Sequence, residues 1–183
     1  MRLFIAAKIS PEIESQLEEF LDGFMKFPAK VKWVTPRNIH LTLKFLGETD
    51  ERIVENVKEA IAEACSNFGP IDIQLKGCGA FPNLRAPRVF WVGIVDHDKN
   101  LAQLATRIDQ EVHTLGFERE RRAFSPHLTL GRVKDQHQLG ALNEAFGAAD
   151  FPSTPLAIKS IYLIQSHLKP TGPVYHDLEE FEL

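Results

Sequence analysis

The chain has 183 residues, of which 44% are hydrophobic and 25% are charged, as in ordinary globular domains. These values exclude a collagen-like, coiled-coil or largely disordered chain. The formal net charge of -4 argues against a protein that coats long nucleic acid, because such proteins need an excess of cations to displace counterions. Contact with a nucleotide or with one RNA end stays open.

The sequence also lacks the marks of a secreted or membrane protein. No stretch approaches the roughly 20 apolar residues of a membrane-spanning helix, and the apolar start is too short for a signal peptide. The two cysteines, Cys65 and Cys78, are too few for a disulfide framework or a structural zinc site, and Cys65 falls in an apolar stripe that predicts burial. We therefore expect a cytoplasmic monomer that does not bind membranes.

The hydrophobic pattern predicts a mixture of strands and helices. In chain order these are a strand over 2–9, a helix over 11–24 that begins at Ser10-Pro11, and strands over 31–34 and 39–46. A helix over 50–68, strands over 71–81 and 88–95, and a helix over 99–115 follow. The chain then continues with a strand over 126–133, a helix over 136–146, and strands over 155–165 and 174–181. Strands that follow one another without a helix favour antiparallel pairing, hence an α+β fold, and no linker divides residues 1–183 into separate domains.

One tetrapeptide occurs twice. His-Leu-Thr-Leu stands at 40–43 and again at 127–130, one copy in each half of the chain, which indicates a duplication with approximate two-fold symmetry. Because side chains alternate across a strand, His40 and Thr42 are expected on one face and the leucines on the other. The same holds for His127 and Thr129.

A single histidine in an apolar strand is more often structural than catalytic. Core packing, however, gives no reason to keep an imidazole and a hydroxyl at the same offsets in both copies. Imidazoles titrate near neutral pH, so one can accept a proton while the other donates one, and threonine hydroxyls can hold phosphate oxygens. This set favours cleavage of a phosphodiester without metal or cofactor. No carboxylate accompanies either motif, and no zinc-hydrolase spacing or base-activated threonine nucleophile is visible.

Longer stretches around the two motifs carry a family resemblance. They are Arg2 to Ala6, Trp33-Val34, Asn38 to Gly47, Arg88 to Gly93 and Phe124 to Val133. Together they resemble the RNA 2',3'-cyclic phosphodiesterases, also called 2'-5' RNA ligases, of the two-histidine phosphoesterase superfamily, over essentially the whole chain. The resemblance implies two pseudo-symmetric lobes, each an antiparallel sheet with outer helices, flanking a central cleft.

The resemblance also implies an activity and roles for the motif residues. The activity is hydrolysis of 2',3'-cyclic phosphate ends of RNA to 2'-phosphate ends, and the same groups could also join 2'-5' ends in reverse. His40 would give a proton to the departing 3'-oxygen, and His127 would activate water. Thr42 and Thr129 would bind the phosphate.

Arg132 matches a basic position of the family that is expected to contact phosphate. Strict alternation places Arg132 on the face opposite His127. Either a bulge at Gly131 turns it back, or the side chain reaches around the strand end. An ordinary surface arginine is the competing interpretation.

Two further residues are candidates for substrate contact. Alternation places Lys44 on the face of His40, and Phe4 could offer a base-stacking surface, although a core strand explains Phe4 equally well. A basic stretch precedes the second motif and could meet an RNA backbone or form a solvated loop: Arg119, Arg121 and Arg122.

Other functions stay open at this point. The substrate could be a small cyclic nucleotide or a 2'-5'-linked oligonucleotide, or the protein could be a binding module that grips RNA ends without turnover. The paired histidines favour an enzyme, because permanently charged arginines would serve simple phosphate binding better.

Overall fold

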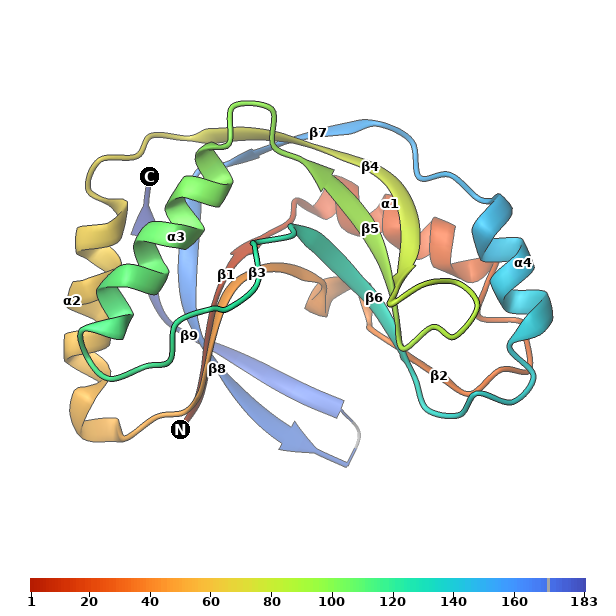
Figure 1. The fold of residues 1–183 in the computed structure, drawn as a ribbon, viewed down its shortest axis with the longest axis horizontal. Helices are drawn as coiled ribbons and strands as arrows, with labels where there is room; N and C mark the ends of the chain where they lie inside the picture. The colour runs from red at the N-terminus through yellow and green to blue at the C-terminus, as the bar shows by residue number, and fades with distance from the viewer. Residues whose placement is uncertain (171) are drawn as a thin grey trace.

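The structure is a computed structural model that describes residues 1–170 and 172–183. Within these residues the strands form one curled antiparallel sheet in the order β7-β4-β5-β6-β3-β1-β8-β9, with β2 paired to β6, and the helices lie outside the curl (Figure 1). The strands are β1 (Arg2–Lys8), β2 (Val31–Trp33), β3 (His40–Glu48), β4 (Ile71–Phe81), β5 (Val89–Val95), β6 (His127–Val133), β7 (Thr154–Ile158), β8 (Ser160–Lys169) and β9 (Gly172–Glu182).

The sheet divides into two matching halves. The first half is β3-β1-β8-β9 and the second is β6-β5-β4-β7, each written from the centre outward. The halves meet where β3 pairs with β6 through the single Cα pair Leu41 and Leu128. An antiparallel pair has a local two-fold axis between its strands, so the approximate symmetry axis passes between these leucines. The predicted α+β fold with two pseudo-symmetric halves is confirmed, and the two predicted sheets are joined here into one.

The helices are α1 (Pro11–Asp22), α2 (Val54–Cys65), α3 (Asn100–His113) and α4 (Gly140–Ala148). Helix α1 begins where the sequence predicts, because the Ser10 hydroxyl accepts a hydrogen bond from the Ile13 N–H at 3.4 Å and Pro11 occupies the first turn. Helix α4 begins later than predicted. Gln138 has a φ of 59°, a left-handed conformation that a helix cannot contain.

Each half is covered by one helix of its own and one from the other half. Helix α1 follows β1 of the first half, yet its Phe20 ring lies 6.1 Å from Phe146 of α4, over the second half. Helix α3 follows β5 of the second half but packs beside α2 over the first (Figure 1). Neither half of the sheet could bury its apolar face without a helix from the other repeat, so we expect both halves to fold as one domain.

The prediction of one continuous strand over 155–165 is wrong, because the structure has two strands there. The two are β7, which pairs with β4 at one edge of the sheet, and β8, which pairs with β1 towards the other edge. Only Lys159 separates them, so the chain itself draws the two ends of the sheet together and the sheet curls. The buried positions shift phase here, from Leu156 and Ile158 to Ile161 and Leu163. That phase shift is a sequence signal of the break.

Both cysteines are free thiols, as the sequence predicts, and burial raises the pKa of Cys65 to about 11. No helix among the described residues is long and apolar enough to cross a membrane.

Candidate active site

The two His-x-Thr pairs lie on the sheet face that carries no helix, which we call the histidine face. The alternating leucines Leu41 and Leu128 are 1% and 0% exposed and belong to the main core under the helices. His40 pairs across the sheet with Lys8, and Thr42 pairs with Ala6, whose methyl group belongs to a separate small cluster on this face. The predicted division of each motif between core and histidine face is confirmed.

The pairing at the symmetry axis brings the two motifs together. Leu41 is the Cα partner of Leu128 in antiparallel strands. This register places His40 of β3 beside Thr129 of β6, and Thr42 beside His127. Each imidazole therefore lies next to the hydroxyl of the other motif, around one point on the sheet.

Both imidazoles are oriented by the same backbone contact. Nδ1 of His40 lies 2.8 Å from the Asn38 carbonyl oxygen, and Nδ1 of His127 lies 2.7 Å from the Ser125 carbonyl oxygen. A carbonyl oxygen can only accept, so Nδ1 carries a proton and donates in each case. Nε2 of each ring is then left for chemistry, as a base when neutral or an acid when protonated. Sequence reasoning missed these carbonyls, because a backbone contact leaves no side-chain signal.

The surroundings of His40 differ from those of His127. The His40 ring stacks on Phe4 at 4.7 Å and meets the edge of Tyr175 at 5.3 Å. Burial lowers the pKa of His40 below its usual 6.5; the hydrogen bond to the Asn38 carbonyl opposes this, and the positive charge of Arg132 adds to it. His127 is more open and meets the edge of Phe81 at 5.0 Å. Tyr175 and Phe81 were not predicted, since neither lies in a motif.

Lys44 does not lie on the face of His40, and that prediction is wrong. The pairing of β1 with β3 runs from Ala6–Thr42 to Ile5–Lys44, so it skips Leu43. This β-bulge shifts the alternation by one residue and turns Lys44 towards the helices, where it is 4% exposed. The next residue, Phe45, moves onto the histidine face beside Phe4, at 6.1 Å between ring centroids, and is 58% exposed.

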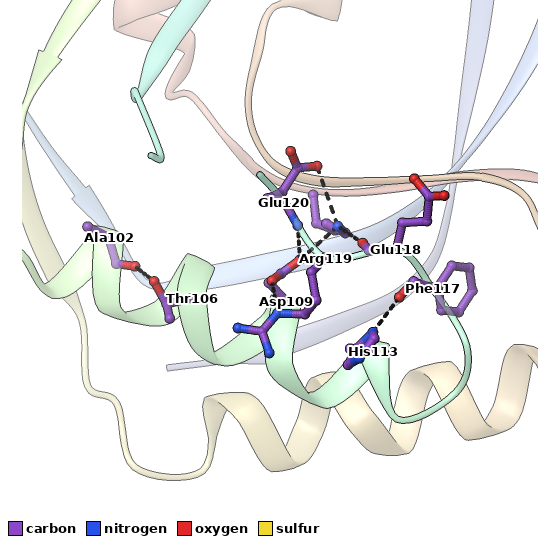
Figure 2. A network of polar contacts seen from close by, with 9 residues as sticks. Ala102, Thr106, Asp109, His113, Phe117, Glu118, Arg119 and Glu120 are labelled. Atoms are coloured by element: carbon purple, nitrogen blue, oxygen red, sulfur yellow. Dashed lines mark hydrogen bonds and ion pairs between the residues drawn. The ribbon is translucent and has the colours of Figure 1, made fainter. Parts of the chain in front are cut away.

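Lys44 is buried at the centre of a polar network, and Figure 2 labels its neighbours Asp109, Glu118, Arg119 and Glu120. Its ammonium donates to the Asp109 carboxylate at 2.8 Å, to the Glu118 carbonyl at 2.7 Å and to the Glu120 carboxylate at 3.4 Å. Arg119 donates to the same aspartate at 2.7 Å. Burial favours a raised pKa for Asp109, but hydrogen bonds from Lys44, the Glu120 N–H and Arg119 outweigh it, and the pKa is lowered. The network ties residues 117–120 to β3 and α3.

Arg132 does lie on the histidine face, because of a second bulge. The pairing of β5 with β6 runs from Trp91–Thr129 to Phe90–Gly131 and skips Leu130. Arg132, paired with Val89, is thereby turned to the side of Thr129. Of the two routes that the sequence left open, the structure shows the bulge. The Arg132 charge acts on the pKa of both His40 and Tyr175.

Phe4 lies on the histidine face but cannot offer a stacking surface. It is 3% exposed, because the rings of His40 and Tyr175 lie against it. Phe4 is therefore a support for His40, and the expected contact of Phe4 with substrate does not hold. In the basic stretch, Arg119 is engaged with Asp109, whereas Arg121 and Arg122 are exposed.

Among the described residues, no three His, Cys, Asp or Glu side chains are grouped so that they could hold a metal ion. The groups available for chemistry are two imidazoles, two hydroxyls and one guanidinium, on one sheet face. Together with the fold they define a pseudo-symmetric α+β protein with a matched histidine site on each side of its axis.

Comparisons with known proteins agree with this class. Residues 31–170 match the model of the 2'-5' RNA ligase superfamily. A relative from Methanocaldococcus jannaschii named RNA 2',3'-cyclic phosphodiesterase is 38% identical, over 99% of this chain and 100% of its own. One of the same name from Methanothermobacter thermautotrophicus is 32% identical, over 100% of this chain and 99% of its own. The chain therefore belongs to the 2'-5' RNA ligase superfamily.

Solved structures share the fold. The crystal structure of TT0787 of Thermus thermophilus is 30% identical with a TM-score of 0.82, and the match covers 100% of this chain and 98% of that one. The structure of E. coli LigT complexed with 3'-AMP has a TM-score of 0.80 at 24% identity, over 100% of this chain and 97% of that one. At that identity the second likeness supports the fold alone.

Proposed function

We propose that the protein hydrolyses 2',3'-cyclic phosphate ends of RNA to 2'-phosphate ends by acid–base catalysis with His40 and His127. The observation that carries the proposal is the matched pair of imidazoles, each held through Nδ1 by a carbonyl two residues upstream, at 2.8 and 2.7 Å. Full-length relatives named for this activity support the same reaction.

The two-fold arrangement suits the geometry of the reaction. In an in-line displacement at phosphorus, the attacking and leaving oxygens lie on opposite sides of the phosphate. Two imidazoles related by an axis through the phosphate site can serve one oxygen each. Nε2 of His127 takes a proton from water as its oxygen bonds to phosphorus. Nε2 of His40 gives a proton to O3' as the P–O3' bond breaks, which leaves a 2'-phosphate and a free 3'-hydroxyl.

The surroundings of His40 suit the role of proton donor. Burial and the Arg132 charge lower the pKa of His40, so its imidazolium is a stronger acid than free histidine. A stronger acid gives up its proton more readily to the alkoxide that forms on O3'. The negative charge of the bound phosphate favours the protonated ring, so substrate binding itself charges the donor.

The remaining groups hold the phosphate. Thr42 and Thr129 flank the axis and can each donate a hydroxyl hydrogen bond to a non-bridging oxygen. Arg132 supplies a permanent positive charge on the same face. None of these roles needs a metal ion, so we propose that the reaction proceeds in EDTA.

Product analysis tests the proposal. An RNA oligonucleotide with a 2',3'-cyclic phosphate end is incubated with the protein in EDTA, and the products are separated against 2'- and 3'-phosphate standards. The proposal predicts the 2'-phosphate alone. A 3'-phosphate product, loss of activity in EDTA, or binding without turnover between pH 5 and 9 would contradict it. The last outcome would indicate a binding module.

A further inference from the structure

The bulge in β3 creates a surface that the reaction described above does not use. Phe45, turned outward by the bulge, is among the most exposed large apolar side chains of the described residues, at 58%. It lines a groove of about 610 Å³ between the end of β3 and residues 117–122. An exposed aromatic ring at the wall of a groove is a typical platform for a nucleic acid base.

This groove lies close to the candidate active site. Phe4 stacks on His40 at 4.7 Å and lies 6.1 Å from Phe45, so a single buried ring separates the imidazole from the exposed one. Phe45 therefore places one wall of the groove near the point where the terminal phosphate would be held.

The opposite wall of the groove carries cations. Arg121 and Arg122 line it and are exposed, and neither forms an ion pair within the part of the chain that the structure describes. Of the two glutamates in this wall, Glu120 is engaged by Lys44, whereas Glu118 contacts that ammonium only through its backbone carbonyl and keeps an exposed carboxylate. The groove thus offers one aromatic surface and two available arginines against one exposed carboxylate, a net positive charge.

These charges indicate which ligand fits. A mononucleotide with a 2',3'-cyclic phosphate has one phosphate, and that phosphate belongs at the histidines. Arg121 and Arg122 would meet a second anion only if the strand continues in the 5' direction. We propose that the Phe45 groove binds the nucleotides that precede the cyclic end, with a base on Phe45 and backbone phosphates at the two arginines. The enzyme would then prefer strands to mononucleotides, an inference that rests on the proposed function.

Kinetics on two substrates test this inference. We compare kcat/KM for a tetranucleotide with a 2',3'-cyclic end and for adenosine 2',3'-cyclic monophosphate. Base stacking is worth about 1–3 kcal/mol, so Phe45→Ala should reduce the ratio of tetranucleotide to mononucleotide about tenfold. Phe45→Trp should restore it, and Met25→Ala, which truncates another exposed apolar side chain (55%), should leave it unchanged. An unaltered ratio in Phe45→Ala would overturn the inference, even if kcat/KM fell equally on both substrates.

A binding measurement separates this inference from the proposed function. Fluorescence anisotropy follows the binding of a labelled tetranucleotide that ends in a 2'-phosphate, so no turnover is needed. Each contact with a single-stranded phosphate contributes about 0.7 to the slope of log Kd against log salt, so Arg121→Gln with Arg122→Gln should reduce that slope by about 1.4. An unchanged slope overturns the inference. If binding responds as expected while the wild-type protein hydrolyses neither substrate, the proposed function fails and the groove assignment stands.

Discussion

The two His-Leu-Thr-Leu motifs are the same up to their fourth residue and then diverge. In both copies the fourth residue, Leu43 or Leu130, is skipped in the pairing to the neighbouring strand. After the bulge, the first half has Lys44 turned inward and Phe45 on the histidine face. The second half has Gly131 inward and Arg132 on the histidine face. The two halves thus share the histidine and threonine of each motif. They differ two residues beyond the fourth motif position, where the first half has the aromatic ring of Phe45 and the second has the cation of Arg132.

The inward positions differ because different segments cover them. Strand β2 pairs with β6, and a Cβ atom on Gly131 would come within 2.6 Å of the Trp33 ring. The corresponding segment over β3, residues 117–120, forms no strand and is held by the Lys44 ammonium instead. A side-chain tether in the first half therefore takes the place of backbone pairing in the second, and it leaves room for the groove beside Phe45.

The largest expected effect comes from removing either of the two histidines, which both halves of the sheet have in common. His40→Ala and His127→Ala should each lower kcat by about two to four decades, because each removes one partner of the acid–base pair. His137→Ala, at a side chain 89% exposed, is the matched control and should retain wild-type turnover. Steady-state hydrolysis of the cyclic-ended oligonucleotide measures this. Retention of wild-type kcat by either site variant would refute the shared role.

The side-chain tether of the first half can be broken by Lys44→Met. This leaves the Asp109 carboxylate, 10% exposed, without its main partner, and we expect a loss of about 3 kcal/mol in the free energy of unfolding. Lys44→Met combined with Asp109→Leu should recover most of the loss, because an apolar pair leaves no unpaired buried charge. Urea unfolding of the two variants checks this. Equal stability of wild-type protein and Lys44→Met would show that the tether is not needed.

The same pair has a predictable pH dependence. The pKa of Asp109 is lower in the folded protein than its usual value, so the folded state binds its proton less tightly than the unfolded chain does. Its contribution to stability is present above about pH 4, the usual pKa of an aspartate, and is lost as the pH falls through the folded value. Unfolding of Asp109→Asn as a function of pH should lack this part of the acid sensitivity. An identical acid profile in the variant would contradict the assignment.

The hydroxyls of Thr42 and Thr129 are related by the symmetry axis, so we expect them to contribute equally to catalysis. Thr42→Val and Thr129→Val keep the shape of the side chain but remove the donor to a phosphate oxygen. Each should lower kcat/KM by about a hundredfold, the lower end of the range for a lost donor. Strongly unequal losses would show that the phosphate lies off the axis.

The smallest expected effect concerns the cation that distinguishes the second half. The Arg132 charge is one of the causes that lower the pKa of His40, behind burial. Arg132→Met should therefore raise the pKa of His40 and shift its titration to higher pH. NMR titration of the imidazole follows this directly. Arg107→Met on the helical face is the control, and a downward shift in Arg132→Met would contradict the proximity of the two groups.

Sequence reasoning succeeded where one strand rule applied without interruption. Alternation places His40, Thr42, His127 and Thr129 correctly, because no bulge occurs within either triplet. It fails at Lys44, since a bulge depends on pairing with a neighbouring strand and no glycine marks the one in β3; at Gly131 a bulge was one of the two routes considered. For that reason Lys44 was expected on the histidine face and Phe45 was not considered.

Other features depend on contacts between distant segments. Tyr175 meets His40 because β8, with β9 beside it, pairs with β1, a contact between distant segments that no local pattern predicts. Phe4 was recognised as a residue near the site, but its burial follows from the rings stacked on it. Local periodicity therefore predicted elements and faces, whereas tertiary pairing decided which side chains meet substrate.

The central claim is that both imidazoles act on one phosphate at the symmetry axis. NMR titration of the wild-type protein with adenosine 2'-monophosphate, the mononucleotide form of the product, tests it by following the ring signals of His40 and His127 together. We expect both signals to shift with the same Kd, and Thr42→Val and Thr129→Val each to weaken both responses. A response of only one imidazole, or two different Kd values, would contradict it.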